Sequence, residues 1–252
     1  MILFFENGRL GNQIIQYIGL RKFFLKDKII FFGCRSLFNT FQGVDAHFLS
    51  KETIHKWFHY GLLKKIIYFF AKIRIFGKIT EDKQPDSYKV ISRRGLFWKI
   101  FVVENFFFRI KDVNNFSKPP QLKIHLIKKA EEWLQIREIN IKTHSIIFIH
   151  FRRGDYLYWP SKEFPAVLSL DWYKKAIDLM KEKLKNPIFV LMSDDKQYLK
   201  DIFKQSESLY ISENSPELDL SIMSLCNYGI LSASTFAWCG AYYANLNNRN
   251  QT

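Results

Sequence analysis

The chain has 252 residues, of which 48% are hydrophobic, so it is long enough for one large domain or two small ones and its composition excludes an intrinsically disordered protein. Its net charge is +14, and the whole surplus lies in residues 1–142, where 26 Lys and Arg face 12 Asp and Glu. The apolar start is too short for a signal peptide, no segment is apolar enough to span a bilayer, and the three cysteines are sparse, so we expect a cytoplasmic protein.

The first elements in chain order predict a strand, a glycine-containing loop and a helix. Ile2–Phe5 is a short apolar strand, and the segment 7–12 carries Gly8 and Gly11 in a turn-rich loop. Apolar residues at helical spacing then predict a helix over Gln13–Lys26, and Ile29–Phe32 is the next strand. This order is typical of the opening of a nucleotide-binding βα unit, although a plain tight turn would give the same loop.

The middle of the chain is less regular. Tyr60–Lys78 mixes apolar and basic residues, which fits either an amphipathic helix on a membrane surface or, as we prefer, a core-facing helix with a solvated basic face. Gly95–Ile110 is strongly apolar and prone to form strands. Asn114–Gln121 is polar and contains two prolines, as expected near a boundary. We predict an N-terminal basic lobe over 1–142 and a C-terminal lobe over 143–252.

The C-terminal lobe alternates strands and helices, which predicts a parallel, Rossmann-like sheet. Asp171 is a candidate N-cap for one of the helices. The predicted strands are 146–151, 187–192, 208–211 and 228–231. The predicted helices of this lobe are 172–184, 196–204, 218–226 and 235–244, and a helix over 125–136 precedes the lobe.

Polar residues follow the strand 146–151 at the point where a parallel sheet binds ligands. His150, Arg152, Arg153 and Asp155 lie there in succession. Adjacent arginines at the mouth of a buried strand require an anion, and guanidinium groups match phosphate oxygens, so we predict a diphosphate site. A surface salt-bridge network, with Asp155 pairing one arginine, is the alternative.

Two further clusters follow other strands of this lobe. Asp194 and Asp195 could bind ribose hydroxyls or a metal, or simply cap a helix. Ser234 and Thr235 stand at the start of the last predicted helix, where their hydroxyls and the backbone N–H groups could bind phosphate or form an ordinary cap. Together with the arginine pair, these clusters favour the phosphate site.

Five segments, in order along the chain, resemble glycosyltransferase family 11, the α-1,2-fucosyltransferases. They are GRLGNQIIQY (8–17), HFRRGDY (150–156), DWYKKAI (171–177), FVLMSDD (189–195) and LDLSIMSLCNYGILSASTFAWCGA (218–241). The resemblance implies a GT-B-like α/β fold with two Rossmann-like lobes and a cleft between them. It also implies inverting transfer of fucose from GDP-fucose without an essential metal or other cofactor.

The resemblance also implies roles for individual residues. Arg152 and Arg153 would hold the pyrophosphate, His150 would lie near the nucleoside, and Asp219 would recognise guanine. Ser234 and Thr235 would face the phosphates, and Asp194 and Phe236 are further candidate substrate-binding residues. Asn12 and Gln13 would line the cleft from the N-terminal lobe, which would be the acceptor side, whereas the C-terminal lobe would bind the GDP-sugar.

The reaction places negative charge on the departing GDP, which arginine and helix-terminus donors stabilise. Inverting attack also needs a base near the acceptor hydroxyl. Asp155 is the first candidate and Glu163 the second, and Asp155 could instead only orient an arginine.

The sequence departs from the family pattern at three places. Arg9 replaces a glycine usual in the family, Cys239 stands where a tryptophan is common, and the chain ends soon after the last helix.

The predicted activity is transfer of L-fucose to the 2-hydroxyl of a galactoside-type acceptor, on an oligosaccharide or lipid-linked glycan. Alternatives are another GDP-sugar transferase or an inactive nucleotide- or glycan-binding lobe. The basic first lobe could hold the protein peripherally at the inner face of an anionic membrane. Nucleic acid is not an expected partner, because the arginine pair lies in the neutral half and no nucleic-acid motif occurs.

Overall fold

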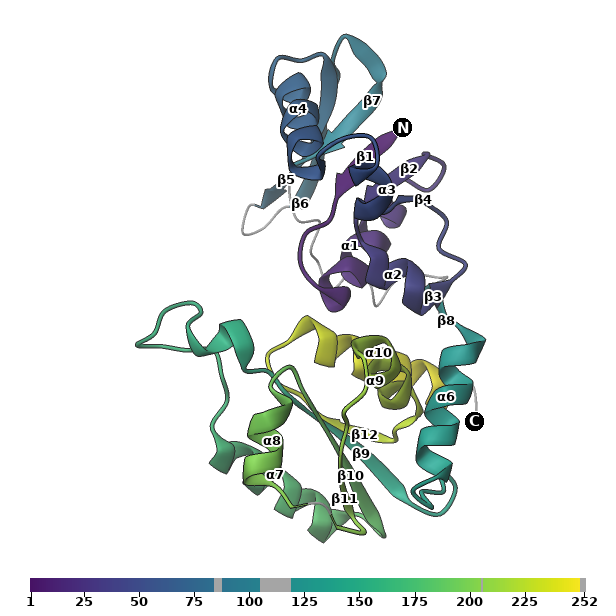
Figure 1. Ribbon diagram of the computed structural model, residues 1–252, viewed down its shortest axis with the longest axis vertical. Helices are drawn as coiled ribbons and strands as arrows, with labels where there is room; N and C mark the ends of the chain where they lie inside the picture. Colours follow the sequence, from purple (N-terminus) through teal and green to yellow (C-terminus); the bar gives the residue numbers. More distant parts are fainter. Residues whose placement is uncertain (84–87, 105–118, 205, 250–252) are drawn as a thin grey trace. The chain divides into compact units, whose positions relative to one another are not determined.

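The computed structural model describes residues 1–83, 88–104, 119–204 and 206–249 (Figure 1). The chain forms two compact units, Met1–Gln121 and Leu122–Thr252. The boundary therefore comes earlier than the predicted one at 142/143. The helix α6 (Ile124–Gln135) belongs to the second unit, because its buried residues Ala130 and Trp133 join that unit's core. Most of the proline-containing segment predicted at the boundary lies outside the described residues.

The first unit is built on a six-stranded sheet. Its strands, in the order β4-β2-β1-β7-β5-β6, are β4 (His47–Leu49), β2 (Ile29–Phe32), β1 (Ile2–Phe5), β7 (Phe97–Val103), β5 (Phe76–Lys83) and β6 (Tyr88–Arg93). All neighbouring strands are parallel except the hairpin of β5 and β6. Every residue of β1 is buried, because helices cover both faces of this central strand.

Helices cover the two faces of this sheet. On one face, α1 (Leu10–Phe23) and α2 (Arg35–Thr40) bring Tyr17 and Phe38 against Phe31 of β2. On the other, α3 (Lys51–His55) and α4 (Tyr60–Lys72) share a buried cluster with β1, β2 and β7. Two short strands, β3 (Phe41–Gln42) and β8 (Gln121–Leu122), form a separate sheet.

The helix predicted over Tyr60–Lys78 is shorter in the structure. It ends as α4 at Lys72, and the strand β5 begins at Phe76. Arg74 adopts a left-handed conformation with φ of 61°, which reverses the chain between the two elements. The β-prone segment 95–110 contributes β7, and its last residues lie outside the described part of the chain.

The second unit has the predicted parallel sheet. Its strands, in the order β11-β10-β9-β12, are β11 (Leu209–Ile211), β10 (Pro187–Ser193), β9 (Ser145–Phe151) and β12 (Tyr228–Ile230). The register places Met192 beside His150 and Ser193 beside Phe151. The polar residues that follow β9 and β10 therefore leave the sheet at the same edge.

Helices cover both faces of this second sheet (Figure 1). Ile146 and Phe148 pack with α6, α9 (Pro216–Leu225) and α10 (Thr235–Arg249), whereas Ile147 and Ile149 pack with α7 (Leu170–Lys183) and α8 (Lys196–Ile202). Alternate residues of a strand point to opposite faces, so both faces of β9 carry apolar residues.

The predicted N-cap of α7 was wrong. The helix begins two residues earlier than predicted, at Leu170, and the N-cap is Ser169, whose Oγ accepts a hydrogen bond from the Trp172 backbone N–H at 3.3 Å. Asp171 lies in the first turn, where its negative charge interacts favourably with the helix dipole without capping the helix.

A candidate nucleotide-sugar site

The candidate site lies at the carboxyl end of β9, where the strand leads into the 3₁₀ helix Gly154–Leu157. The apolar strand is buried up to Phe151, and the two arginines follow directly. Their side chains are only 13% and 21% exposed, for Arg152 and Arg153 respectively. Guanidinium groups this enclosed need anionic partners, and the neighbouring strand supplies two of them.

Arg152 is held between two carboxylates. Its Nη1 lies 2.9 Å from Asp194 Oδ2, and its Nη2 donates to Asp155 Oδ1. The guanidinium carbon lies 5.1 Å from the centre of the Tyr156 ring. The buried Nε has no hydrogen-bond partner among the described residues. Both terminal nitrogens are thus engaged within the protein, which fixes the position of this arginine.

Arg153 is held differently. Its Nε donates to Asp195 Oδ2 at 3.2 Å, and its guanidinium lies 3.5 Å from the centre of the Tyr198 ring. Nη1 and Nη2 form no hydrogen bond with any residue that the structure describes. The aromatic ring and the aspartate orient the guanidinium while its two terminal N–H pairs stay available for a ligand.

Asp194 connects the two arginines. Its Oδ2 pairs with Arg152, and its Oδ1 accepts the Arg153 backbone N–H at 3.0 Å. Gly154 allows this approach, because a Cβ there would lie 2.5 Å from Asp194 Oδ2. Asp195 caps α8 by accepting the Tyr198 N–H at 3.1 Å, so the capping interpretation holds for this second carboxylate.

His150 is buried beneath this edge of the sheet. Its Nδ1 lies 2.7 Å from Ser232 Oγ, its carbonyl accepts the Tyr173 hydroxyl at 3.1 Å, and its ring packs against Phe236. Burial lowers the pKa of His150 to about 4, so the imidazole is neutral at physiological pH. The histidine joins the end of β9 to the loop that precedes α10.

Ser234, Thr235 and Phe236 form the start of α10. Ser234 Oγ accepts the Phe236 backbone N–H at 3.2 Å, which is the geometry of an ordinary N-cap. The Tyr156 hydroxyl donates to the carbonyl of the neighbouring Ala233 at 2.9 Å. The arginine segment and the helix start are therefore joined at one edge of the sheet, as the sequence predicted.

Asp219 lies in the first turn of α9 and is only 6% exposed. The Ser212 hydroxyl, just beyond β11, donates to its Oδ1. Burial raises the pKa of Asp219 from 3.8 to about 7, and the Ser212 hydrogen bond and the Lys196 charge oppose that rise. This carboxyl therefore changes its protonation state near neutral pH.

The two candidate bases lie in the loop that follows β9. The Asp155 side chain is 60% exposed, and its one ion pair among the described residues is with Arg152. Glu163 is exposed, and hydrogen bonds from its own backbone and from Ser161 lower its pKa. Glu163 forms no ion pair with either arginine among the described residues, so the structure brings Asp155, and not Glu163, to the arginine pair.

Asn12 and Gln13 belong to the first unit, where they follow the loop after β1. Gln13 is 2% exposed, its Nε2 donates to Glu6 Oε1 at 3.1 Å, and its Oε1 accepts the Leu37 N–H at 3.1 Å. Gly8 has φ of 86°, and a Cβ there would clash with Asn12 Nδ2 at 2.2 Å. Gln13 thus holds the loop against α2, and its buried amide supports the geometry of the loop.

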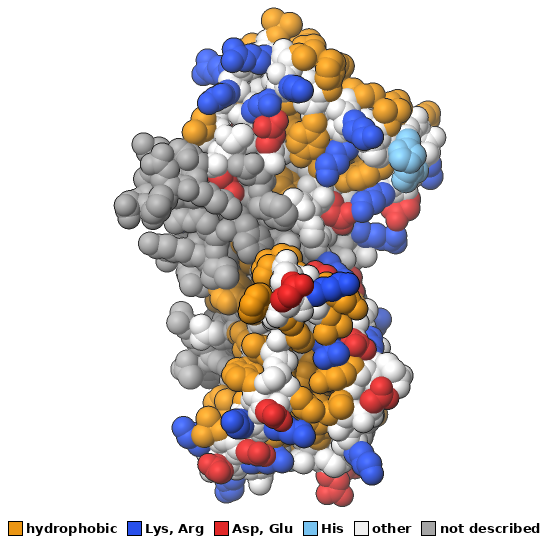
Figure 2. All heavy atoms as spheres, turned by 90° about the vertical axis from the view of Figure 1, so that its left-hand side faces the viewer, with side chains coloured by type: hydrophobic (Ala, Val, Ile, Leu, Met, Phe, Trp, Pro, Cys, Tyr) orange, Lys and Arg blue, Asp and Glu red, His pale blue; other side chains and the backbone are white. Residues whose placement is uncertain are grey.

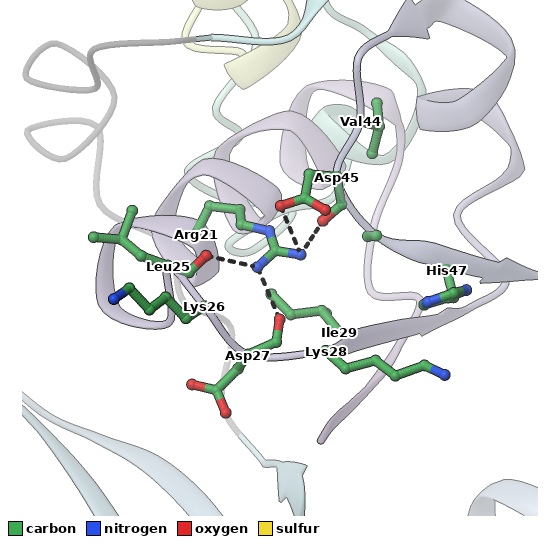
Figure 3. A pocket seen from close by; sticks show the side chains of 10 residues that line it. Arg21, Leu25, Lys26, Asp27, Lys28, Ile29, Val44, Asp45 and His47 are labelled. Carbon is green, nitrogen blue, oxygen red and sulfur yellow. Dashed lines mark hydrogen bonds and ion pairs between the residues drawn. The ribbon is translucent and has the colours of Figure 1, made fainter.

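A hollow of the first unit, lined by residues that follow α1 and by residues that precede β4, contains a buried arginine that already has partners (Figure 3). Arg21 Nη1 donates to the carbonyls of Phe24, Leu25 and Asp27, and Nη2 contacts Asp45. These bonds tie the end of α1 to the segment before β4. The arginine has a structural role here, because backbone carbonyls and Asp45 occupy its two terminal nitrogens.

Sequence reasoning missed the residues that orient the predicted ones. Tyr198 stacks on Arg153, Ser232 pairs with His150, and Ser212 pairs with Asp219. Each lies in or beside another element that borders the same edge of the sheet. Among the described residues, no group of three or more His, Cys, Asp or Glu side chains could hold a metal ion.

Solved glycosyltransferases share this fold. The structure of NodZ α-1,6-fucosyltransferase co-crystallised with GDP aligns with 95% of this chain and 91% of its own, with a TM-score of 0.53 and 10% identity. POFUT1 in complex with GDP aligns with 97% of this chain and 95% of its own, with a TM-score of 0.50 and 11% identity. This likeness concerns the fold alone, and it confirms the predicted α/β, GT-B-like architecture.

The family follows from the sequence comparison. The model of glycosyl transferase family 11 matches residues 96–249, which is more than half of the chain. The chain belongs to glycosyltransferase family 11, as its motifs predicted. The match covers the whole arginine-bearing sheet and the helices that surround it.

Curated relatives match the chain over shorter stretches. The O-antigen biosynthesis glycosyltransferase WbnK of Escherichia coli is 32% identical over 37% of this chain, and an α-1,2-colitosyltransferase of Escherichia coli is 32% identical over 42%. Galactoside α-(1,2)-fucosyltransferase 1 of Mus musculus is 28% identical over 44% of the chain. The matches cover 33%, 38% and 31% of these relatives, so the chain spans about a third of their length.

Proposed function

We propose that the chain is an inverting glycosyltransferase that moves L-fucose from GDP-fucose to the 2-hydroxyl of a galactoside-type acceptor. The product would be a glycan or surface polysaccharide. The observation that carries this proposal is Arg153, whose terminal N–H groups are available at the carboxyl edge of a parallel sheet. Membership of family 11 and the names of the relatives support the sugar and the linkage.

Arg153 would bind the diphosphate of the donor. Cleavage of the sugar–phosphate bond leaves negative charge on GDP, and a preorganised guanidinium stabilises that charge at no reorganisation cost. Asp195 and Tyr198 hold the group in place before the ligand arrives. Backbone N–H groups at the start of α10, near Thr235, would add donors to the same phosphates.

Arg152 would act as a positioning residue. Its two terminal nitrogens are bound to Asp194 and Asp155, which links the loop after β9 to the end of β10. This bridge fixes the backbone of Arg153, since Asp194 also accepts the Arg153 N–H. Loss of Arg152 would therefore disorganise the diphosphate site rather than remove one of its direct contacts.

The nucleoside end of the donor would be recognised on the α9 and α10 side of the sheet. An ionised Asp219 can accept two N–H groups, which matches the N1 and N2 donors of guanine. His150 would support this side of the site by holding Ser232 and Phe236, because it is itself buried and neutral. GDP binding should therefore strengthen as pH rises through the pKa of Asp219.

Asp155 would accept the proton from the attacking hydroxyl. It is the exposed carboxylate beside the arginine pair, whereas Glu163 bonds to its own loop. An Asp155→Asn variant separates this role from that of a clamp, since the amide oxygen can still accept from Arg152 but cannot take a proton. If Asp155 is the base, the Asp155→Asn variant should lose most of its turnover and keep its affinity for GDP.

The acceptor would contact the aromatic loop that follows the 3₁₀ helix. Tyr158, Trp159 and Phe164 are 62%, 57% and 80% exposed. The Trp159 ring packs against Tyr156, with centroids 5.4 Å apart, and thereby connects this loop to the helix that carries Asp155. Exposed aromatic faces beside a polar site are suited to the apolar faces of sugar rings.

No metal or other cofactor is required in the proposed reaction, because arginine and helix-terminus donors supply the positive charge that a metal would otherwise provide. Transfer should therefore persist with a chelator present, and loss of activity that Mg²⁺ or Mn²⁺ restores would overturn this point.

The test is transfer with a panel of donors. Purified chain would be assayed for binding and turnover with GDP-fucose, GDP-mannose and UDP-galactose, using a galactoside acceptor. We expect turnover with GDP-fucose only. Turnover with another GDP-sugar would show that this sugar, and not GDP-fucose, is the donor. GDP binding without any turnover would identify a nucleotide-binding lobe without activity.

A further inference from the structure

The first unit carries a cluster of cations that the proposed reaction does not use. A hollow at the end of α4 is lined by Lys72, Arg74, Lys78, Arg93 and Arg94, and none of the described residues that line it is acidic. Lys78 pairs with Glu104 at 2.7 Å. The other four form no ion pair with a described residue, so the described lining of the hollow carries a surplus of positive charge.

The backbone builds this hollow from two separate segments. The Leu96 N–H donates to the Arg74 carbonyl at 2.7 Å, and the Phe97 N–H donates to the Ile75 carbonyl at 2.8 Å. Gly95 makes the approach possible, because a Cβ there would lie 2.4 Å from the backbone of Phe76. The arginines before β7 are thereby fixed against the end of α4.

Arg74 stands where a glycine would be expected. It follows the last turn of α4 with φ of 61°, its N–H bonds to the Ala71 carbonyl, and the next N–H bonds to the Phe70 carbonyl. This is the helix-terminating geometry in which glycine is the preferred residue. An arginine at this position is strained, which indicates a role for the side chain rather than for the backbone.

Exposed apolar side chains border the hollow. Leu96, Phe97 and Trp98 follow one another at 77%, 56% and 59% exposure, and Phe69 of α4 and Ile73, the residue that follows this helix, are also exposed. Figure 2 shows basic and apolar side chains gathered over the region where α4 lies in Figure 1. Tryptophan, phenylalanine and leucine beside cations are typical of surfaces that enter the interface of a bilayer.

We propose that this surface binds an anionic lipid bilayer, with a lipid phosphate in the cationic hollow and Leu96, Phe97 and Trp98 in the interfacial layer. This surface gives a location for the peripheral membrane contact, for which the charge distribution gave only the N-terminal lobe. The inference is independent of the donor site, which lies in the other unit. Among the described residues, none of the helices has both the length and the hydrophobicity that a membrane span requires.

The test compares vesicle binding by the full chain and by matched variants. Phosphatidylcholine vesicles with and without phosphatidylglycerol would be used in co-sedimentation at low and high salt. We expect binding only to the anionic vesicles, and weaker binding at high salt. Arg74→Gly should weaken it about fivefold, as expected for one juxtamembrane cation. Because glycine suits the left-handed conformation, the fold should be at least as stable as the wild type.

Lys26→Gln is the control, because it removes one exposed cation of the same unit away from the hollow. Arg94→Gln is a second variant inside the hollow, and Trp98→Ser tests the apolar border. Unchanged binding by all three of these test variants, Arg74→Gly, Arg94→Gln and Trp98→Ser, would overturn the proposal. Equal loss in Lys26→Gln would instead show a general charge effect. Tight binding of inorganic phosphate without vesicle binding would identify a soluble anion and also overturn it.

Discussion

Replacing Asp219 with asparagine is expected to stabilise the fold above neutral pH and to weaken GDP binding. The native carboxyl is 6% exposed and bonded to Ser212, and burial raises its pKa from 3.8 to about 7. Between these two values the folded chain keeps a proton that the unfolded chain has released. The stability that the protonated group contributes is full below pH 3.8 and is lost as pH rises through 7.

The size of this effect follows from the two pKa values. Their difference corresponds to about 4 kcal/mol at full ionisation, at 1.36 kcal/mol for each factor of ten. Between about pH 5 and about pH 8 the wild type should lose about 2–3 kcal/mol relative to Asp219→Asn, which has no proton to release. The amide keeps its oxygen for the Ser212 hydroxyl, so packing should change little.

Urea denaturation of both proteins at the two pH values measures this difference. GDP titration at about pH 8 should show about 10- to 100-fold weaker binding by the variant, because one charged hydrogen-bond acceptor is lost. Equal pH dependence of stability in the two proteins would refute the electrostatic argument. Unchanged GDP affinity would refute the assignment of Asp219 to guanine while leaving that argument intact.

Three other substitutions test the site. Asp155→Asn should lower kcat by about 10²–10⁴ with little change in GDP affinity, as measured by steady-state transfer and calorimetry, and a parallel loss of affinity would indicate a clamp instead. Gly154→Ala should destabilise the fold by about 1–3 kcal/mol in urea titrations, because its Cβ would clash with Asp194, and wild-type stability would contradict this. Trp159→Ala should raise the acceptor KM while GDP binding stays constant in the same assays, and an unchanged KM would remove the aromatic loop from the acceptor site.

Much of the second unit could be predicted from the sequence, because its strands are short apolar runs separated by helical patterns. The end of β9 was identified for a physical reason: charged residues directly after a buried strand must lie at the edge of the sheet. The structure bears this out, with Arg152 and Arg153 enclosed beside Asp194 and Asp195. The family match confirms the resemblance that the same motifs carried.

The partners of these residues could not be predicted, since they depend on tertiary contacts. Tyr198 stacks on Arg153 from a helix about 45 positions later in the chain. Ser232 pairs with His150, which lies 82 positions earlier in the chain. The end of α4 was also missed, because Arg74 occupies a conformation that the sequence normally marks with glycine. The domain boundary shifted for a similar reason, as α6 packs with the later sheet.

Transfer of fucose from GDP-fucose to a galactoside by the wild type and by Arg153→Ala tests the central claim most directly. Lys174→Ala, an exposed residue of α7, is the matched control. The account predicts product with the wild type and the control, and loss of about 10²–10³ in kcat/KM for Arg153→Ala with its unfolding midpoint preserved. Absence of GDP-fucose binding by the wild type, or full activity of Arg153→Ala, would contradict it.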